Sequence, residues 1–252
     1  MPYRLLFIYA HPDDESFGVA GIARMYADRG AEVALVTATR GDAGRAGEPP
    51  LCDRAGLPAR REAELHEAAR LLGIGHVTVL DYLDKHLAEA PADKIRRELV
   101  SAIRRHRPHV VVSFDPDGAS RHPDHIAISR FASDAIAAAD DPRWYADTGK
   151  PHRVRRLLWI SPVMPWDAPR SANLANEPGV DFLVDISRYR DIKAEALRAH
   201  RTQHVSIYRH FFHLPDVDRI LSFETFRQAF GPALKKRPAT DIFESIDSSE
   251  SR

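Results

Sequence analysis

The sequence alternates short apolar runs with longer amphipathic segments, and this alternation constrains the fold more than any other feature. The run RLLFIYA (4–10) is followed by a segment with helical periodicity (16–30) that ends at Gly30, and then by a second apolar run (31–39). Such continuous apolar runs are typical of strands buried on both faces of a parallel sheet. Because a β–α–β unit with short joins is almost always a right-handed crossover, residues 4–39 predict the start of a layered α/β domain.

The same alternation continues to residue 204. We expect further strands at 76–82, 109–115, 153–161 and 180–187, and helices at 58–74, 92–108, 123–140 and 190–204. Strands that alternate with helices predict a three-layer, Rossmann-like α/β fold with a mostly parallel sheet. Ligands bind such sheets at the C-terminal ends of the strands, so we expect the active site there.

The domain organisation follows from length and composition. The chain has 252 residues, and we expect one α/β domain over 1–236 with a polar, weakly ordered tail over 237–252. Two connections, 40–57 and 162–179, are rich in glycine and proline and too long for simple joins. Loops of this length are often lids or binding loops, and disorder is the competing interpretation.

Charge and cysteine content exclude several classes of function. Lys plus Arg and Asp plus Glu number 36 each, which gives no overall basic footprint for nucleic acid or an anionic membrane. Cys52 is the only cysteine, so neither an internal disulfide nor a thiolate metal cluster is available. The N-terminal apolar run is too short for a signal peptide or a membrane span. We therefore expect no membrane span and a cytoplasmic protein, and the sequence leaves a homo-oligomer open.

Two polar clusters follow predicted strands. HPDDE (11–15) comes directly after the first strand, where a glycine-rich dinucleotide turn is absent, and HPDH (122–125) follows the fourth. Adjacent strand ends would bring imidazoles and carboxylates together, which suits Zn²⁺ or another divalent first-row ion. The competing interpretation is that these acids only favour helix N-termini and that the histidines are ordinary surface or core residues. The six residues concerned are His11, Asp13, Asp14, His122, Asp124 and His125.

The paired motifs AHPDDE and HPDH, in this order, resemble the zinc-dependent N-acetylglucosamine deacetylase family, which includes PIG-L, the LmbE-like proteins and the mycothiol- and bacillithiol-pathway deacetylases. The resemblance extends to TRGDAG (39–44), RREAELHEAARLLGI (60–74) and KAEALRAHRTQ (193–203). It implies that His11, Asp14 and His125 bind zinc, with Fe²⁺ or another divalent first-row metal as an alternative.

The resemblance also implies catalytic roles. Asp13 would be the general base for the attacking water. His122, as a cationic imidazole, would stabilise the oxyanion and could pass a proton to the leaving amine. Asp124 would orient a histidine, whereas Glu15 would have no part in the chemistry. Arg61 matches an arginine that contacts the polar aglycone in mycothiol-pathway relatives, with a solvated helix charge as the alternative. Asp42 is expected to bind sugar hydroxyls or to cap its loop.

The function that follows is removal of an N-acetyl group from an N-acetylglucosamine-type sugar or conjugate. The expected partner is therefore a small-molecule amino-sugar substrate. The tyrosine near HPDH in mycothiol-pathway enzymes has no counterpart in the preceding DGASR (117–121). Two alternatives stay open: an amidase that acts on a thiol conjugate or another amide with the same metal centre, and a non-catalytic relative that binds metal or sugar.

Overall fold

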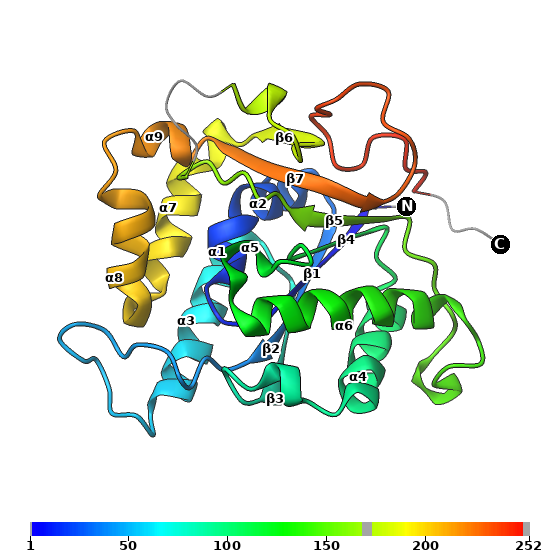
Figure 1. Cartoon of the computed structure of the whole chain (residues 1–252), viewed down its shortest axis with the longest axis horizontal. Helices are drawn as coiled ribbons and strands as arrows, with labels where there is room; N and C mark the ends of the chain where they lie inside the picture. Colours follow the sequence, from blue (N-terminus) through cyan, green and yellow to red (C-terminus); the bar gives the residue numbers. More distant parts are fainter. Residues whose placement is uncertain (1, 168–172, 249–252) are drawn as a thin grey trace.

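A seven-stranded sheet organises the chain, with strands in the order β3-β2-β1-β4-β5-β7-β6 (Figure 1). The structure is a computed structural model and describes residues 2–167 and 173–248. The strands are β1 (Arg4–Tyr9), β2 (Glu32–Thr39), β3 (His76–Tyr82), β4 (Val110–Ser113), β5 (Arg156–Ile160), β6 (Phe182–Asp185) and β7 (Phe223–Phe230). The first five run parallel, and β7 pairs antiparallel with both β5 and β6. The expected mostly parallel α/β fold is confirmed.

Helices cover both faces of this sheet (Figure 1). The helices are α1 (Asp14–Gly18), α2 (Ala20–Asp28), α3 (Leu57–Leu72), α4 (Ala92–His106), α5 (Gly118–Arg121), α6 (Pro123–Asp140), α7 (Arg190–Ala199), α8 (His204–Ile207) and α9 (Val217–Ile220). Helices α2, α3 and α7 pack on one another, and α4 packs on α6. Strands β1, β2 and β4 lie between these two groups and are almost entirely buried, as their apolar runs require. None of the helices in the described ranges is long and apolar enough to cross a membrane.

Two elements differ from the sequence prediction. The expected helix 16–30 is two helices, because Val19 adopts a non-helical φ of −140° between α1 and α2. The first turn of α2 is then capped by Glu224, which accepts the backbone N–H groups of Gly21 and Ile22. Strand β7 was not predicted. Its buried and exposed positions do not follow the continuous apolar pattern of the parallel strands.

The segment 237–248, which the sequence assigns to a polar tail, packs on the domain. Ile242 is fully buried, and Phe243 stacks on Tyr3 with ring centroids 4.2 Å apart. The buried guanidinium of Arg156 donates to the backbone carbonyls of Ile242 and Glu244. This part of the chain therefore closes one edge of the core, and residues 249–252 lie outside the described ranges.

The sheet has its topological switch point between β1 and β4. From β1 the chain moves outward through β2 and β3, and from β4 it moves in the other direction to β5. The neighbouring pair β1 and β4 therefore end side by side, with their following loops at the same edge. The two polar clusters lie there, as the sequence predicts, and this crevice is the usual ligand position in an open α/β sheet.

Candidate active site

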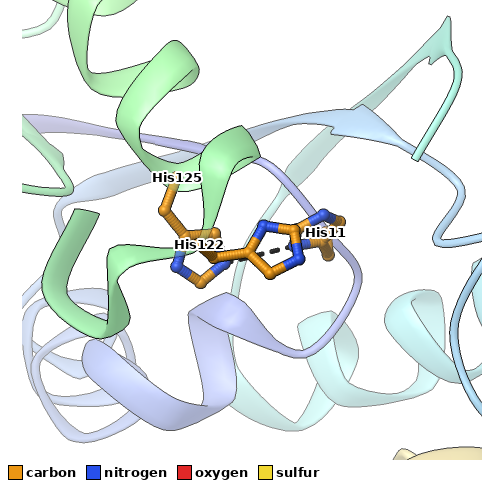
Figure 2. Close-up of side chains that lie close together, drawn as sticks. All are labelled: His11, His122 and His125. Carbon is orange, nitrogen blue, oxygen red and sulfur yellow. Dashed lines mark hydrogen bonds between the residues drawn. The ribbon is translucent and has the colours of Figure 1, made fainter. Parts of the chain in front are cut away.

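A cavity of about 380 Å³ opens at the carboxyl ends of β1 and β4. His11 leaves β1, whereas His122 and His125 stand at the start of α6, and Figure 2 shows the three imidazole rings gathered at one point. The cavity is also lined by Asp13 and Asp14. Its volume lies within the range of roughly 300–1,000 Å³ that is usual for small-molecule sites.

Among the described residues, His11, His122 and His125 form a group that could hold a metal ion, and Asp14 lies beside two of them. Nδ1 of His11 lies 3.2 Å from Nε2 of His125, and that nitrogen lies 3.3 Å from Oδ1 of Asp14. The second carboxylate oxygen of Asp14 lies 3.7 Å from Nδ1 of His11. Two imidazole nitrogens and one carboxylate, with the cavity on the open side, match the ligand number of a catalytic metal site.

The backbone turn after β1 fixes Asp14. Its Oδ2 accepts the N–H groups of Ala10 and His11 at 3.1 and 2.8 Å, which leaves Oδ1 directed to His125. Burial alone would raise the pKa of Asp14, but the imidazoles of His125 and His11 outweigh it and lower that pKa. Asp14 therefore offers an ionised oxygen to this point.

The tautomers of both histidines suit metal binding. Nδ1 of His125 lies 3.2 Å from the carbonyl oxygen of Gly118, so an N–H there leaves Nε2 with its lone pair toward Asp14. Nε2 of His11 lies 3.1 Å from Asp124 and 3.2 Å from Asp84, so an N–H there leaves the Nδ1 lone pair free. The two nitrogens lie 3.2 Å apart, so either one of them carries a proton toward the other or a cation lies between them.

Two buried carboxylates therefore hold His11 from behind. Asp124 is fully buried and also accepts the backbone N–H groups of Lys85 and Leu87 at 2.6 and 3.1 Å. Burial lowers the pKa of His11, but Asp124, Asp84 and Asp14 outweigh it and raise that pKa to about 10. The carboxylates thus stabilise positive charge here. Because the donors around Asp124 already occupy its oxygens, the group His11–Asp84–Asp124 is a support for the imidazole, not an open metal site.

The backbone at the start of α6 sets the tautomer of His122. Its Nδ1 accepts the backbone N–H of Asp124 at 3.2 Å, so the ring proton belongs on Nε2. Burial, followed by repulsion from His11 and His125, lowers the pKa of His122. Both the backbone contact and the lowered pKa favour a neutral N–H donor here, whereas the sequence analysis expected a cationic imidazole.

Asp13 stands apart from Asp14 because of its backbone. Its φ of 116° is in the left-handed region that side-chain-bearing residues rarely adopt, and the carboxylate turns into the cavity beside Arg61. The Nη2 atom of Arg61 lies 3.3 Å from Oδ2 of Asp13. Burial raises the pKa of Asp13 to about 6, although Arg61 opposes the shift. A carboxylate with this pKa is suited to general-base chemistry at neutral pH.

Glu15 is fully buried beneath this turn. Its Oε1 accepts the hydroxyl of Ser16 at 2.6 Å and lies 2.7 Å from Nε2 of His200, and its Oε2 accepts the backbone N–H of Asp13 at 3.1 Å. Burial lowers the pKa of His200, but the carboxylate of Glu15 outweighs it and raises that pKa. A buried ion pair thus supports the backbone of Asp13, whereas the sequence interpretation gave Glu15 no part in the site.

The two expected substrate-binding residues are placed differently. Arg61 lines the cavity, but it is buried and donates to the backbone carbonyls of Pro12 and Gly41. It is not the solvated helix charge of the alternative interpretation. Asp42 is not among the described residues of the cavity wall, and its carboxylate accepts the N–H of Asp84 at 3.1 Å, which is a loop-capping contact.

Asp84 and Phe114 are site residues that sequence reasoning missed. Asp84 follows β3, so an acid after a third strand end was an available signal. Phe114 follows β4 and stacks on His125 with ring centroids 3.9 Å apart and planes 7° from parallel. It carried no signal, because an aromatic residue after a buried strand is ordinary core.

The fold and the cluster together define an α/β protein with a metal-ligand set at the switch point of its sheet. A family model described as PIG-L, GlcNAc-PI de-N-acetylase, matches residues 6–136. The chain is 34% identical over 238 residues to a 1D-myo-inositol 2-acetamido-2-deoxy-alpha-D-glucopyranoside deacetylase of Rhodococcus jostii, covering 79% of this chain and 81% of that protein. A Streptomyces scabiei protein of the same name is 31% identical over 291 residues, covering 97% and 90%.

Solved structures share the fold. The conserved protein TT1542 from Thermus thermophilus superposes with a TM-score of 0.68 at 29% identity, covering 91% of this chain and 96% of that one. N,N'-diacetylchitobiose deacetylase from Pyrococcus horikoshii gives a TM-score of 0.68 at 24% identity, covering 89% and 83%. The chain belongs to the PIG-L family, and it is a deacetylase.

Proposed function

We propose that the chain uses a divalent metal ion to hydrolyse the N-acetyl group of an N-acetylglucosamine-type sugar or conjugate. Zn²⁺ is the first candidate for this ion. The observation that carries the proposal is the convergence of His11 Nδ1, Asp14 Oδ1 and His125 Nε2 beside the carboxylate of Asp13. Membership in the family and the names of the relatives support the amino-sugar substrate.

The donor set fits a divalent first-row ion. His11, Asp14 and His125 would hold it, and two imidazoles with one carboxylate suit Zn²⁺ and Fe²⁺ about equally. Asp84 and Asp124 add negative charge behind His11 and fix its ring. When bound, such an ion supplies a Lewis acid that polarises the amide carbonyl and lowers the pKa of water.

Asp13 would remove the proton from the attacking water. Its carboxylate lines the cavity, and a pKa of about 6 keeps it ionised at neutral pH while still basic enough to accept a proton. It could then return that proton to the amine as the C–N bond breaks, which gives acetate and a free amine. The guanidinium of Arg61 holds the carboxylate in place at 3.3 Å.

His122 would donate its Nε2–H to the oxygen of the tetrahedral intermediate. The backbone N–H of Asp124 fixes the tautomer that this requires. A preorganised donor of this kind is worth about 10²–10³ in kcat. The side chain of Asp124 would act at one remove, by orienting His11 for the metal, so it is a positioning residue.

We propose substrate contacts only for side chains that line the cavity. Two nitrogens of Arg61 donate to backbone carbonyls, so only the part of its guanidinium that borders the cavity would contact the substrate. For Asp42 we propose the loop-capping role, because its carboxylate binds the backbone of Asp84.

The test is Asp13→Asn against His11→Gln, with Asp28→Asn, a surface residue paired with Arg24, as the matched control. We expect Asp13→Asn to keep stoichiometric zinc by elemental analysis and to lose at least about 10²-fold in kcat. His11→Gln should lose the metal as well. Activity is measured as the release of primary amine from a panel of N-acetylglucosaminides. The protein is loaded with Zn²⁺ or Fe²⁺ for this assay.

Each contrary outcome has a definite meaning. Full activity in Asp13→Asn would remove the base assignment. Bound metal with no turnover on the sugar panel, but turnover on thiol conjugates or simple amides, would favour the amidase alternative. Bound metal with no turnover on any amide would favour a non-catalytic relative.

A further inference from the structure

The cavity has two chemically different flanks, and the order of the strands places them on opposite sides of the metal-ligand cluster. The loops after β2 and β3, on one side of β1, contribute Gly44, Asp84 and Lys85. The end of β5 and the loop after it lie on the other side of β4 (Figure 1). They contribute Ile160, Met164 and Trp166 to the lining. One flank is therefore polar and charged, whereas the other is apolar.

The apolar flank is a packed surface. Phe17 and Trp166 meet edge to face with centroids 6.2 Å apart, and both contact Phe211 behind them, at 5.1 and 5.0 Å. Gly18 brings the backbone close to this wall: a Cβ there would lie 2.4 Å from the side chain of Ile160. The aromatic faces are thus held in place before a substrate arrives.

Four polar side chains line the cavity on or beside this flank among the described residues. Asp167 is an exposed carboxylate, and Gln203, Ser206 and His210 come from the segment after α7. The amide nitrogen of Gln203 already donates to the backbone carbonyl of Arg45 and to the hydroxyl of Thr202. Nδ1 of His210 lies 2.8 Å from the carbonyl oxygen of Ser206, so it has a local partner already. Two side chains with a fixed positive charge line the cavity, and neither is on this flank. Arg61 comes from α3 and donates to the turn after β1, and Lys85 belongs to the opposite flank.

These two flanks make different demands on a substrate. Sugar hydroxyls can find partners beside Asp84 and Lys85, whereas hydroxyls placed against Met164 and Trp166 would lose water without replacement hydrogen bonds. An acetyl methyl is too small to cover Phe17, Ile160, Met164 and Trp166 together. A polyhydroxylated aglycone such as inositol, which the names of the relatives specify, suits this flank poorly.

We infer that the substrate carries an apolar aglycone, an aryl or alkyl group on the anomeric oxygen, which packs against Phe17, Met164 and Trp166. The inference rests on the proposed N-deacetylation, because that reaction limits the acyl group to an acetyl and leaves the flank to the rest of the molecule. It names the class of substrate: a hydrophobic N-acetylglucosaminide.

The experiment compares kcat/KM for N-acetylglucosaminides that differ only in the aglycone. Methyl, phenyl and inositol glycosides, each in both anomers, are assayed by release of primary amine with the zinc-loaded protein. We expect the phenyl glycoside to exceed the methyl glycoside by about 10–100-fold, the range for added apolar groups in a matching pocket. The inositol glycoside should not exceed the methyl glycoside.

Two variants locate the effect. Trp166→Ala should lower kcat/KM for the phenyl glycoside far more than for the methyl glycoside, and Met164→Gln, which keeps side-chain length but adds an amide, should do the same if Trp166→Ala does not fold. The matched control is Trp144→Ala. That tryptophan is 42% exposed, contacts Arg96 and lies outside the cavity, so the phenyl preference should be unchanged.

The outcomes separate the inferred apolar aglycone from the proposed N-deacetylation. Equal rates for all aglycones, a preference for inositol, or a phenyl preference that survives both flank variants would overturn the inference and leave deacetylation standing. A preference for longer N-acyl chains with no effect of the aglycone would also overturn it. If no glycoside is turned over, the proposed function fails. Calorimetry with phenyl and methyl glucosaminide then tests the apolar flank alone. Tighter binding of the phenyl compound supports the apolar aglycone, and equal binding refutes it.

Discussion

Replacing Glu15 by glutamine removes one negative charge from a site with no access to solvent. The carboxylate has three donors around it: the hydroxyl of Ser16 at 2.6 Å, Nε2 of His200 at 2.7 Å and the backbone N–H of Asp13 at 3.1 Å. Glutamine has the same shape but only one acceptor oxygen, and its NH₂ group must face at least one of those donors. The change therefore tests whether this buried pair holds the turn that carries Asp13.

The expected loss of stability follows from these contacts. A buried donor left without an acceptor costs about 1–3 kcal/mol. Removing one partner of a buried ion pair costs about 3–5 kcal/mol, but His200 can limit this cost by releasing its proton. We expect Glu15→Gln to lower the free energy of unfolding by about 2–4 kcal/mol, a large share of the roughly 5–15 kcal/mol that holds a typical domain.

Catalysis should fall as well. The φ of 116° at Asp13 is a conformation that costs about 1–3 kcal/mol unless the surroundings hold it. Without Glu15 the turn can relax and move the carboxylate of Asp13, so we expect a loss of about 10–100-fold in kcat. Bound metal should remain, because the N–H groups of Ala10 and His11 hold Asp14 independently.

Urea unfolding at neutral pH, elemental analysis and amine-release kinetics measure the three quantities on one preparation. Glu67→Gln, an exposed glutamate near Arg201, is the control and should change the free energy of unfolding by less than about 0.5 kcal/mol. A double-mutant cycle with His200→Gln isolates the pair. If Glu15→Gln matches the control in both unfolding and kcat, the support assigned to this ion pair is refuted.

Two further predictions concern Asp124 in the site and His152 outside it. Asp124→Asn should weaken metal binding about 10–100-fold in a chelator competition, because an amide cannot accept hydrogen bonds from His11, Lys85 and Leu87 together. The control is Asp134→Asn at an exposed position, which should bind metal normally. His152 donates from Nε2 to the carbonyl of Pro108, and burial lowers its pKa to about 4. The unfolded chain then binds more protons between about pH 6.5 and pH 4, so up to about 3 kcal/mol of stability is lost as pH falls through that window. His152→Gln keeps the donor and should flatten this dependence in urea unfolding; an unaltered slope would assign it to other groups.

The parallel half of the fold could be predicted because each strand buried on both faces leaves a continuous apolar run. Strand β7 lacks that signature: Glu224 and Arg227 interrupt it, and its antiparallel pairing with β5 and β6 follows from no local pattern. The break at Val19 is equally non-local. Glu224 stabilises the new helix start from 203 residues away. Sequence periodicity reports burial along a segment, not the partners that distant segments supply.

At the site, the rule that parallel strands end at one edge brought His11 together with His122 and His125 from sequence alone. The rule did not extend to Asp84, although that residue also follows a strand, because β3 lies two strands away from β1. Its carboxylate reaches His11 across the end of β2, and Asp42 helps by accepting its backbone N–H. The sequence left Asp42 either a contact with sugar hydroxyls or a loop cap, and its contact with the backbone of Asp84 is of the second kind.

The motif HPDDE shows why neighbouring acids need the structure to be told apart. Asp13, Asp14 and Glu15 are successive residues, but the left-handed φ at Asp13 and the helix that starts at Asp14 turn their carboxylates to three different environments. Asp13 lines the cavity beside Arg61, Asp14 faces His125, and Glu15 is buried against His200. The partner of Glu15 lies 185 residues away in the chain, so the motif alone could not distinguish an inert glutamate from the support of the proposed base.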